Sequence, residues 1–247
     1  MILEHKKVGE TPLELLERVR TEKPEFAHAT LSYAGRLDPM AEGVMLILVG
    51  DTENAPENRK KFLGLDKEYV ATFLVGVKTD TGDALGLVQE GGVAQSVTLE
   101  QIQRDLQKIL AIKTQKVPWF SAFTVNGIKL FDHFKAGNLD VERPVKNIEI
   151  RELELLNISS QTSDELKKYI FESIGKVHGD FRQEEILKNW QKFFMQYEGI
   201  QKTNEQIFSV FEVRLRVSSG TYIRVLTENF SFAVTLLKLK RTKIYMS

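Results

Sequence analysis

The 247-residue sequence contains no cysteine, which excludes disulfide bonds and thiolate chemistry. No apolar run approaches the roughly 18 residues that a membrane-spanning helix needs. The N-terminal segment MILEHKKVGETPLELLERVR lacks the apolar core of a secretory signal. A reducing compartment suits such a chain, and we expect the protein to be cytoplasmic.

An excess of charge of one sign is also missing. Lysine plus arginine and aspartate plus glutamate number 34 each, for a formal net charge of zero. Overall charge therefore does not indicate a nucleic-acid-binding protein, although a local basic stripe can neutralise phosphates within a neutral chain. The strongest local candidate is KLKRTK at 238–243, but a charge run taken alone is usually a solvated face.

Several common catalytic signatures are absent as well. The four histidines are scattered without the spacing of metal ligands, so no metal site is expected. There is no Walker loop, no GxGxxG and no GxSxG. Zinc hydrolases, P-loop NTPases and nucleotide oxidoreductases are therefore poorly supported.

The residues that are present favour one α+β domain over 1–247, with a 42% hydrophobic content that is ample for a core. Capping boxes at Thr11 with Glu14 and at Thr98 with Gln101 predict the starts of two helices. Alternating or continuous apolar residues predict strands at 45–50, 68–79 and 146–158, and another strand that begins at 208.

Residues 159–208 differ from their surroundings, because they are polar and charged with apolar residues at helical spacing. This pattern predicts a helical hairpin inserted between strands, and we expect it to project from the sheet. Its two apolar stripes are spaced to pack on each other; they contain Leu166, Ile170 and Ile174, then Ile186, Trp190, Phe193 and Tyr197. Its basic residues could reach RNA phosphates, or the hairpin could be purely structural; they are Lys167, Lys168, Lys176, Arg182, Lys188 and Lys192.

Four stretches could carry chemistry, and each has a plainer structural explanation. Asp38 in GRLDPMAEG could be only a turn acid, and Tyr69 could be only a core aromatic of its strand. The aromatics of VPWFSAFTVNGIKLFDHFKAG could likewise be core, and VSSGTYIRVL could be an ordinary turn before a helix. The order of the four stretches, however, is distinctive.

Taken together, these stretches resemble the TruB family of pseudouridine synthases, which isomerise a uridine in the T loop of tRNA. The family's Gly-x-Leu-Asp-Pro-x-Ala-x-Gly turn is matched at 35–43, and its Gly-Thr-Tyr-Ile-Arg is present intact at 220–224. Further similar stretches stand in the family's order at 66–69, 79–83, 120–127, 143–144 and 239–242. The resemblance implies the pseudouridine synthase fold, a mixed and mostly antiparallel sheet with flanking helices.

The resemblance also implies the roles of individual residues. Asp38 would be the nucleophile, Arg224 would pair with it, and Tyr69 would stack on the flipped uridine. Tyr33, Tyr222 and Leu239 would complete the substrate pocket, while Lys240, Arg241 and Lys243 would contact RNA phosphates. The reaction would need no cofactor, and the expected protein is a monomer that binds the tRNA T stem-loop and acts at position 55.

The sequence departs from the family pattern in ways that leave alternatives open. Tyr33 replaces a histidine that usually stands two residues before the glycine of the turn. The segment GRLD at 35–38 is also similar to the corresponding segment of pseudouridine synthases that modify ribosomal RNA. The expected chain is a catalytic domain without the C-terminal PUA domain of many relatives. The alternatives are a pseudouridine synthase for another RNA, or a non-catalytic RNA-binding or tRNA-folding protein on the same scaffold.

Overall fold

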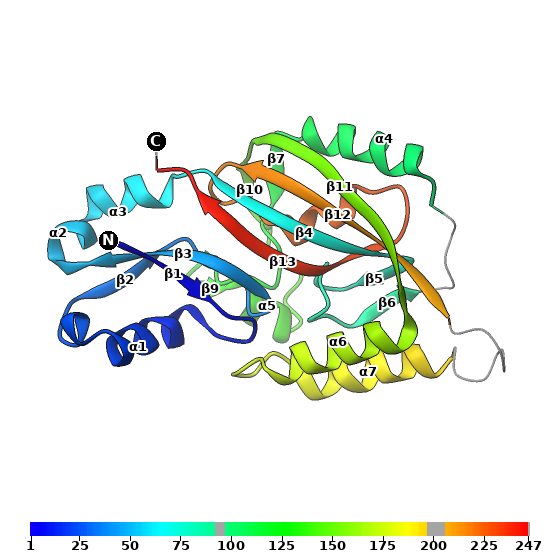
Figure 1. Ribbon diagram of the computed structural model, residues 1–247, viewed down its shortest axis with the longest axis horizontal. Helices are drawn as coiled ribbons and strands as arrows, with labels where there is room; N and C mark the ends of the chain where they lie inside the picture. The colour runs from blue at the N-terminus through cyan, green and yellow to red at the C-terminus, as the bar shows by residue number, and fades with distance from the viewer. Residues whose placement is uncertain (92–96, 197–205, 247) are drawn as a thin grey trace.

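A computed structural model describes residues 1–91, 97–196 and 206–246. Its centre is a seven-stranded sheet whose main path runs β1-β3-β13-β4-β12-β11, with β2 paired to β3 (Figure 1). These strands are β1 (Ile2–Lys6), β2 (Leu31–Ala34), β3 (Ala41–Val49), β4 (Lys67–Val75), β11 (Ile150–Thr162), β12 (Ile207–Val217) and β13 (Val234–Ile244). All pairs within it are antiparallel except β13 with β3, which confirms the predicted mixed, mostly antiparallel sheet.

Smaller elements surround this sheet. Three two-stranded ladders pair β5 (Val77–Thr79) with β6 (Val88–Gly91), β7 (Thr114–Lys116) with β10 (Val145–Asn147), and β8 (Thr124–Val125) with β9 (Ile128–Lys129). The α-helices are α1 (Pro12–Glu22), α2 (Gly50–Asn54), α3 (Pro56–Leu63), α4 (Leu99–Leu110), α5 (Leu130–Lys135), α6 (Ser163–Gly175) and α7 (Gln183–Met195). Two 3-10 helices, η1 (Pro24–Phe26) and η2 (Ile223–Asn229), complete the described elements.

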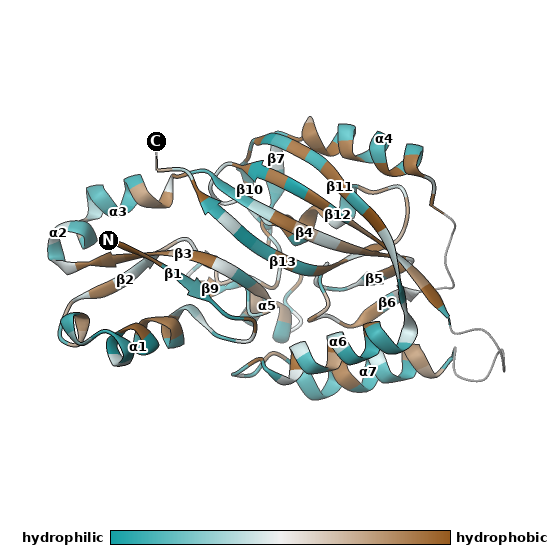
Figure 2. Cartoon of the chain, in the orientation of Figure 1, coloured by the Kyte–Doolittle hydropathy of each residue, from teal (hydrophilic) through white to brown (hydrophobic). Residues whose placement is uncertain are grey.

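Successive side chains of a strand point to opposite faces of the sheet, and the central strands accordingly contribute to two separate hydrophobic clusters. Phe73, Phe211 and Leu236 belong to the cluster that also takes in α1, α4 and η2, whereas their neighbours Leu74, Val210 and Leu237 belong to the cluster with α6 and α7. Brown and teal residues alternate along β11 and β12 in Figure 2, as expected for strands with one apolar and one polar face. The two sets of helices therefore cover opposite sides of the sheet.

Both predicted capping boxes are present. The hydroxyl of Thr11 accepts a hydrogen bond from the backbone N–H of Glu14, whose carboxylate accepts one from the N–H of Thr11. Thr98 and Gln101 make the same reciprocal pair at the start of α4. Each box satisfies two backbone N–H groups that a helix leaves unpaired at its first turn.

Three predicted strands have different bounds in the structure. The strand predicted at 68–79 is broken into β4 and β5 at Gly76, which has a φ of +88°. The strand predicted at 45–50 already begins at Ala41, because β13 pairs with its first residues. The strand predicted at 146–158 is two strands, β10 and β11, and the second continues to Thr162.

The predicted helical hairpin is present as α6 and α7, but it does not project from the sheet. Its apolar residues share one cluster with residues of β4, β12 and β13, and the indole N–H of Trp190 donates to the carbonyl of Ala84 at 3.0 Å. The prediction that it would project from the sheet is wrong because its apolar side chains pack against those of β4, β12 and β13 as well as against one another. Tyr197, predicted to extend the second stripe, lies outside the described residues. No helix in the described part of the chain has the length and apolar character needed to cross a bilayer.

Candidate active site

Asp38 lies in the connection between β2 and β3. Gly35, with a φ of +87°, begins the turn, and the N–H of Ala41 donates to the carbonyl of Asp38 at 3.0 Å. Gly43, with a φ of +116°, faces β13 so closely that a Cβ there would come within 2.2 Å of the carbonyl oxygen of Arg241. The two glycines of the motif therefore shape the turn and allow β13 to pair with β3 beside it.

The predicted pair between Asp38 and Arg224 is confirmed. Nε of Arg224 donates to Oδ2 of Asp38 at 2.9 Å. The Arg224 side chain is 4% exposed whereas the Asp38 side chain is 44% exposed. The carboxylate is thus held from behind by a buried positive charge while it remains open to a substrate.

The remaining nitrogens of Arg224 hold two other segments of the chain. Nη1 donates to the carbonyl of Thr81 at 3.1 Å and Nη2 to the carbonyl of Phe120 at 2.6 Å. Burial opposes the charged form of Arg224, but the negative charges of Asp38 and Asp83 outweigh it and raise its pKa. The guanidinium therefore stays charged and is fixed in one orientation by three partners.

Asp83 is a second carboxylate of this site, and the sequence analysis did not single it out as a site residue. Its Oδ2 lies 3.7 Å from Nε of Arg224, and its Oδ1 accepts from Thr81 Oγ1 and from the N–H of Leu85. Burial raises the pKa of Asp83 to about 6, with Arg224 acting against the rise. Its signal in the sequence was the stretch TDTGD, whose Gly82 would place a Cβ 2.4 Å from the carbonyl oxygen of Arg224.

The prediction that Arg241 contacts RNA phosphates is wrong. Its side chain is buried, and its guanidinium donates to Tyr69 Oη and to the carbonyls of Gly35, Arg36 and Val44. A side chain enclosed in this way supports the turn that carries Asp38 and cannot face a phosphate. The composition of KLKRTK could not show that Arg241 is buried while Lys240 and Lys243 are exposed, because strand geometry decides which of these side chains face solvent.

Lys6 is a further buried cation beside the Asp38 turn, and the sequence analysis did not identify it. Its ammonium donates to the carbonyl of Ala41 at 2.6 Å and lies 3.4 Å from the carbonyl of Pro39. Burial lowers the pKa of Lys6 to about 8. No pattern in HKKVGET distinguishes it from its neighbour Lys7, so only the three-dimensional structure shows that it braces the end of the Asp38 turn.

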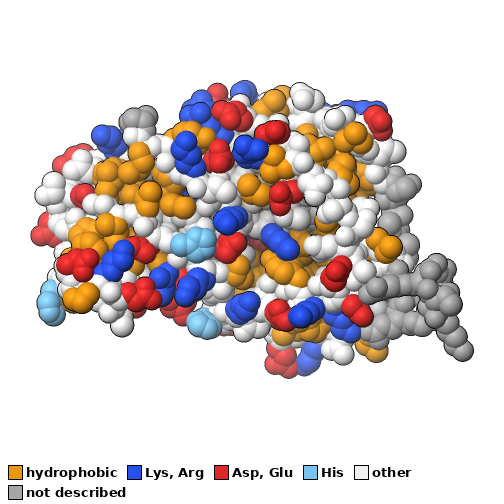
Figure 3. Space-filling view, in the orientation of Figure 1, with side chains coloured by type: hydrophobic (Ala, Val, Ile, Leu, Met, Phe, Trp, Pro, Cys, Tyr) orange, Lys and Arg blue, Asp and Glu red, His pale blue; other side chains and the backbone are white. Residues whose placement is uncertain are grey.

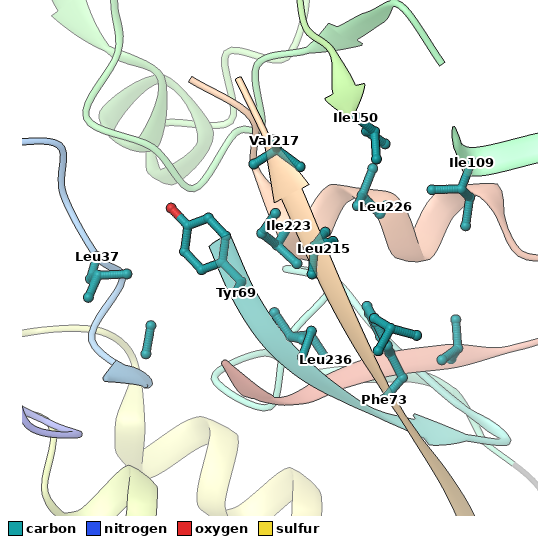
Figure 4. Packing of buried hydrophobic residues seen from close by; sticks show 14 of the residues in the cluster. Leu37, Tyr69, Phe73, Ile109, Ile150, Leu215, Val217, Ile223, Leu226 and Leu236 are labelled. Atoms are coloured by element: carbon teal, nitrogen blue, oxygen red, sulfur yellow. The ribbon is translucent and has the colours of Figure 1, made fainter. Parts of the chain in front are cut away.

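Tyr69 lies within the larger hydrophobic cluster and is 6% exposed. In Figure 4 its ring is at the end of the cluster that faces Leu37, with Leu215 and Ile223 on its other side. Its hydroxyl accepts a hydrogen bond from Nε of Arg241 at 3.1 Å. Stacking of Tyr69 on a base stays a prediction.

The other predicted pocket residues are Leu239, Tyr222 and Tyr33. Leu239 lines a small hollow at Asp38, together with Met40, Ala41, Asp83, Leu236, Leu237 and Lys238. Tyr222 is anchored by Gln115, whose side-chain amide exchanges two hydrogen bonds with its backbone, and burial together with the charge of Asp38 raises its pKa. Tyr33 lies on β2, with the guanidinium carbon of Arg36 at 5.9 Å from its ring centroid.

Exposed cations remain at two of the three predicted phosphate positions. Lys240 and Lys243 are exposed on β13, and the Lys243 ammonium lies 4.5 Å from the ring centroid of Tyr245. Figure 3 shows that blue and red side chains are interspersed on this face, including over α6 and α7, so no large patch of one sign is visible there. In the part of the chain that the structure describes, no group of three histidine, aspartate or glutamate side chains could hold a metal ion.

Comparison with known proteins defines the class of this fold. A crystal structure of a Cbf5-Nop10-Gar1 complex superposes with a TM-score of 0.52 at 15% identity, over 97% of this chain and 47% of that one. The model of the TruB family pseudouridylate synthase N-terminal domain matches residues 23–173, which include Asp38 and Asp83. The fold is therefore that of the pseudouridine synthases.

The chain belongs to the TruB family. It is 31% identical over 163 residues to tRNA pseudouridine synthase B of Psychrobacter arcticus, a match of 65% of this chain and 42% of that protein. It is 26% identical over 216 residues to the protein of the same name from Endomicrobium trichonymphae, a match of 86% of this chain and 71% of that protein. The matched part spans less than half the length of the first of these relatives.

Proposed function

We propose that this chain is a tRNA pseudouridine synthase, an isomerase that converts a uridine of the T loop, at position 55, to pseudouridine. One observation carries the proposal. Asp38, in the family's signature turn, presents a half-exposed carboxylate that is bonded from behind to the buried guanidinium of Arg224. A carboxylate held in this way is oriented, charged and accessible, as a nucleophile must be.

The reaction rearranges one nucleotide without adding or removing atoms. The bond from the sugar to N1 of uracil breaks, the base turns, and a bond from the sugar to C5 forms. The proton leaves C5, and N1 gains one. Asp38 would attack the sugar or the base and depart again when the new bond has formed, in the manner of carboxylate nucleophiles in glycosidic chemistry.

The target base must leave its stack before Asp38 can reach it. Proteins that do chemistry on a base extrude it into a pocket and hold it by stacking and by contacts to its edges. Leu239 at the Asp38 hollow and Tyr222 near the carboxylate would line such a pocket, and Tyr69 would supply the aromatic ring. The exposed ammonium groups of Lys240 and Lys243 would contact the RNA backbone.

The names of the relatives support tRNA as the substrate. The test is to map pseudouridine after incubation of the protein with three transcripts: a tRNA, the same tRNA with cytidine at position 55, and a ribosomal RNA fragment. We expect one new pseudouridine in the first transcript and none in the other two. Product in the ribosomal fragment alone would replace tRNA by another RNA, and binding to tRNA without product would favour the non-catalytic alternative.

A further inference from the structure

The connection between α6 and α7, residues 176–182 and here called the hairpin tip, contacts three other parts of the molecule. His178 Nδ1 lies 2.6 Å from Oε1 of Glu14 on α1, and the ammonium of Lys135 on α5 lies 2.8 Å from Oδ2 of Asp180. A Cβ at Gly9 would come within 2.2 Å of the carbonyl oxygen of Lys176. The tip is thus seated against the rest of the domain and does not hang free.

Arg182, the last residue of the tip, makes a more buried ion pair than His178 or Asp180. Its side chain is 16% exposed, Nη1 donates to Oδ2 of Asp80 at 2.9 Å, and the Asp80 side chain is itself 10% exposed. The guanidinium carbon lies 4.5 Å from the ring centroid of Phe120 and 6.0 Å from that of Phe134. A single side chain therefore combines an ion pair on one segment with a stacking contact on another.

The two segments that Arg182 touches are the two that hold Arg224. Asp80 precedes Thr81, whose carbonyl accepts from Nη1 of Arg224, and the Phe120 carbonyl accepts from Nη2. Asp80 also accepts from the N–H of Leu87 at 2.8 Å, so its own loop is closed. Displacement of either segment would move an acceptor of Arg224 and, through it, the Asp38 carboxylate.

The backbone conformation of Arg182 also indicates that this residue is held in place. Arg182 has a φ of +63° and a ψ of 26°, a left-handed conformation that residues with a side chain rarely adopt. Such strain persists where the surrounding structure fixes the residue. Here the strained position is the one that aims the guanidinium between Asp80 and Phe120.

We propose that Arg182 is a positioning residue for the reaction, and that the α6–α7 hairpin acts as a clamp on the two loops that orient Arg224. The proposal rests on the proposed function, because it assigns the clamp to the chemistry at Asp38. It gives the inserted hairpin a role that does not depend on phosphate contacts, since the guanidinium of Arg182 is already paired with Asp80.

The test compares Arg182→Met, Arg182→Lys and the matched control Arg214→Met. Arg214 also pairs with a carboxylate, Glu154, but it is half exposed on the open side of β12. Hydrogen exchange of the free protein is measured first. We expect Arg182→Met to exchange faster at 80–83 and 117–137, with α1 and β12 unchanged, and Arg214→Met to match the wild type.

Single-turnover rates on tRNA are measured next, at several RNA concentrations. Since a misplacement of about 1 Å at a reacting group can cost 10²-fold in rate, we expect Arg182→Met to slow the chemical step by about 10-fold with little change in the RNA concentration for half-maximal rate. Arg182→Lys keeps a charge for Asp80 but lacks the planar group that stacks on Phe120, so its rate should lie between those of the wild type and Arg182→Met.

Two results would overturn the proposal. One is exchange and rate in Arg182→Met that equal those of the wild type. The other is faster exchange throughout the chain together with a lowered melting temperature, which would reduce Arg182 to a general structural contact. If the wild-type protein modifies no RNA, the proposed function fails, whereas the local exchange difference, measured without RNA, still decides whether Arg182 clamps the two loops.

Discussion

The Asp38 site and the α6–α7 hairpin are built on opposite principles. The site joins Asp38, Asp83 and Arg224, which are far apart in the sequence and are linked by one hydrogen bond, from Arg224 to Asp38, and one ion pair, between Arg224 and Asp83. The hairpin joins residues that are close in the sequence, such as Leu166, Ile170 and Trp190, and they are linked by apolar contacts. The first arrangement orients reactive groups, and the second buries surface.

This difference predicts which property each region controls. Changes at the site should reduce the rate far more than they reduce stability, unless they leave a buried charge without a partner. Changes in the body of the hairpin should reduce stability and leave the rate of the remaining folded protein intact. The tip, through Arg182, is where the two regions meet.

Apart from removal of the nucleophile itself, the largest expected effect is that of Arg224→Met, which removes the link between Asp38 and its neighbours. Loss of a preorganised electrostatic partner typically costs about 10²–10³ in rate, and we expect a loss of at least that size in single-turnover assays. Asp83 would lose its countercharge inside the protein, so the free energy of unfolding should fall by roughly 3–5 kcal/mol. Arg214→Met is the control. A near-normal rate for Arg224→Met would show that the Arg224 guanidinium is not needed for the reaction.

Trp190→Ala tests the other side of the comparison. Trp190 is fully buried, and its ring stacks on Phe194 at a centroid distance of 5.8 Å. Replacement of a buried tryptophan by alanine commonly costs about 3–5 kcal/mol, which denaturant unfolding would measure. The rate per folded molecule at low temperature should stay within a few-fold of the wild type; a loss as large as that of Arg224→Met would show that the two regions are not separable.

Asp83→Asn should give the smallest effect, and its signature is a pH dependence. Because burial raises the pKa of Asp83 from 3.8 to about 6, its charge beside Arg224 is present above about pH 6 and lost below it. We expect the wild-type rate to fall as the pH drops through 6, and Asp83→Asn, which is always neutral, to be several-fold slower at pH 8 without that step.

Stability should change with pH in the opposite direction. The folded state holds the Asp83 proton more tightly than the unfolded state, so this group stabilises the fold below about pH 4 and that contribution is lost as the pH rises through 6. Asp83→Asn should lack this dependence in unfolding experiments. Identical pH profiles of the two proteins would show that Asp83 does not titrate at the site.

The fold and the residues at its centre were predictable from the sequence to different extents. The helices that begin at Thr11 and Thr98 were predictable because their signals are local, and so was the hairpin. The pair of Asp38 with Arg224 was predictable only through the resemblance to a family, since nothing local joins residues so far apart. The burial of Lys6 and Arg241 was not predictable, because it depends on which strand pairs beside the Asp38 turn.

The most direct test of the central claim is the amount of pseudouridine that Asp38→Asn forms in a T-loop tRNA under single-turnover conditions. The substitution keeps the size of the side chain and removes the charge that attacks. We predict no detectable product, with tRNA affinity close to that of the wild type and normal product from the exposed-acid control Asp51→Asn. Product at a rate near that of the wild type would contradict this prediction.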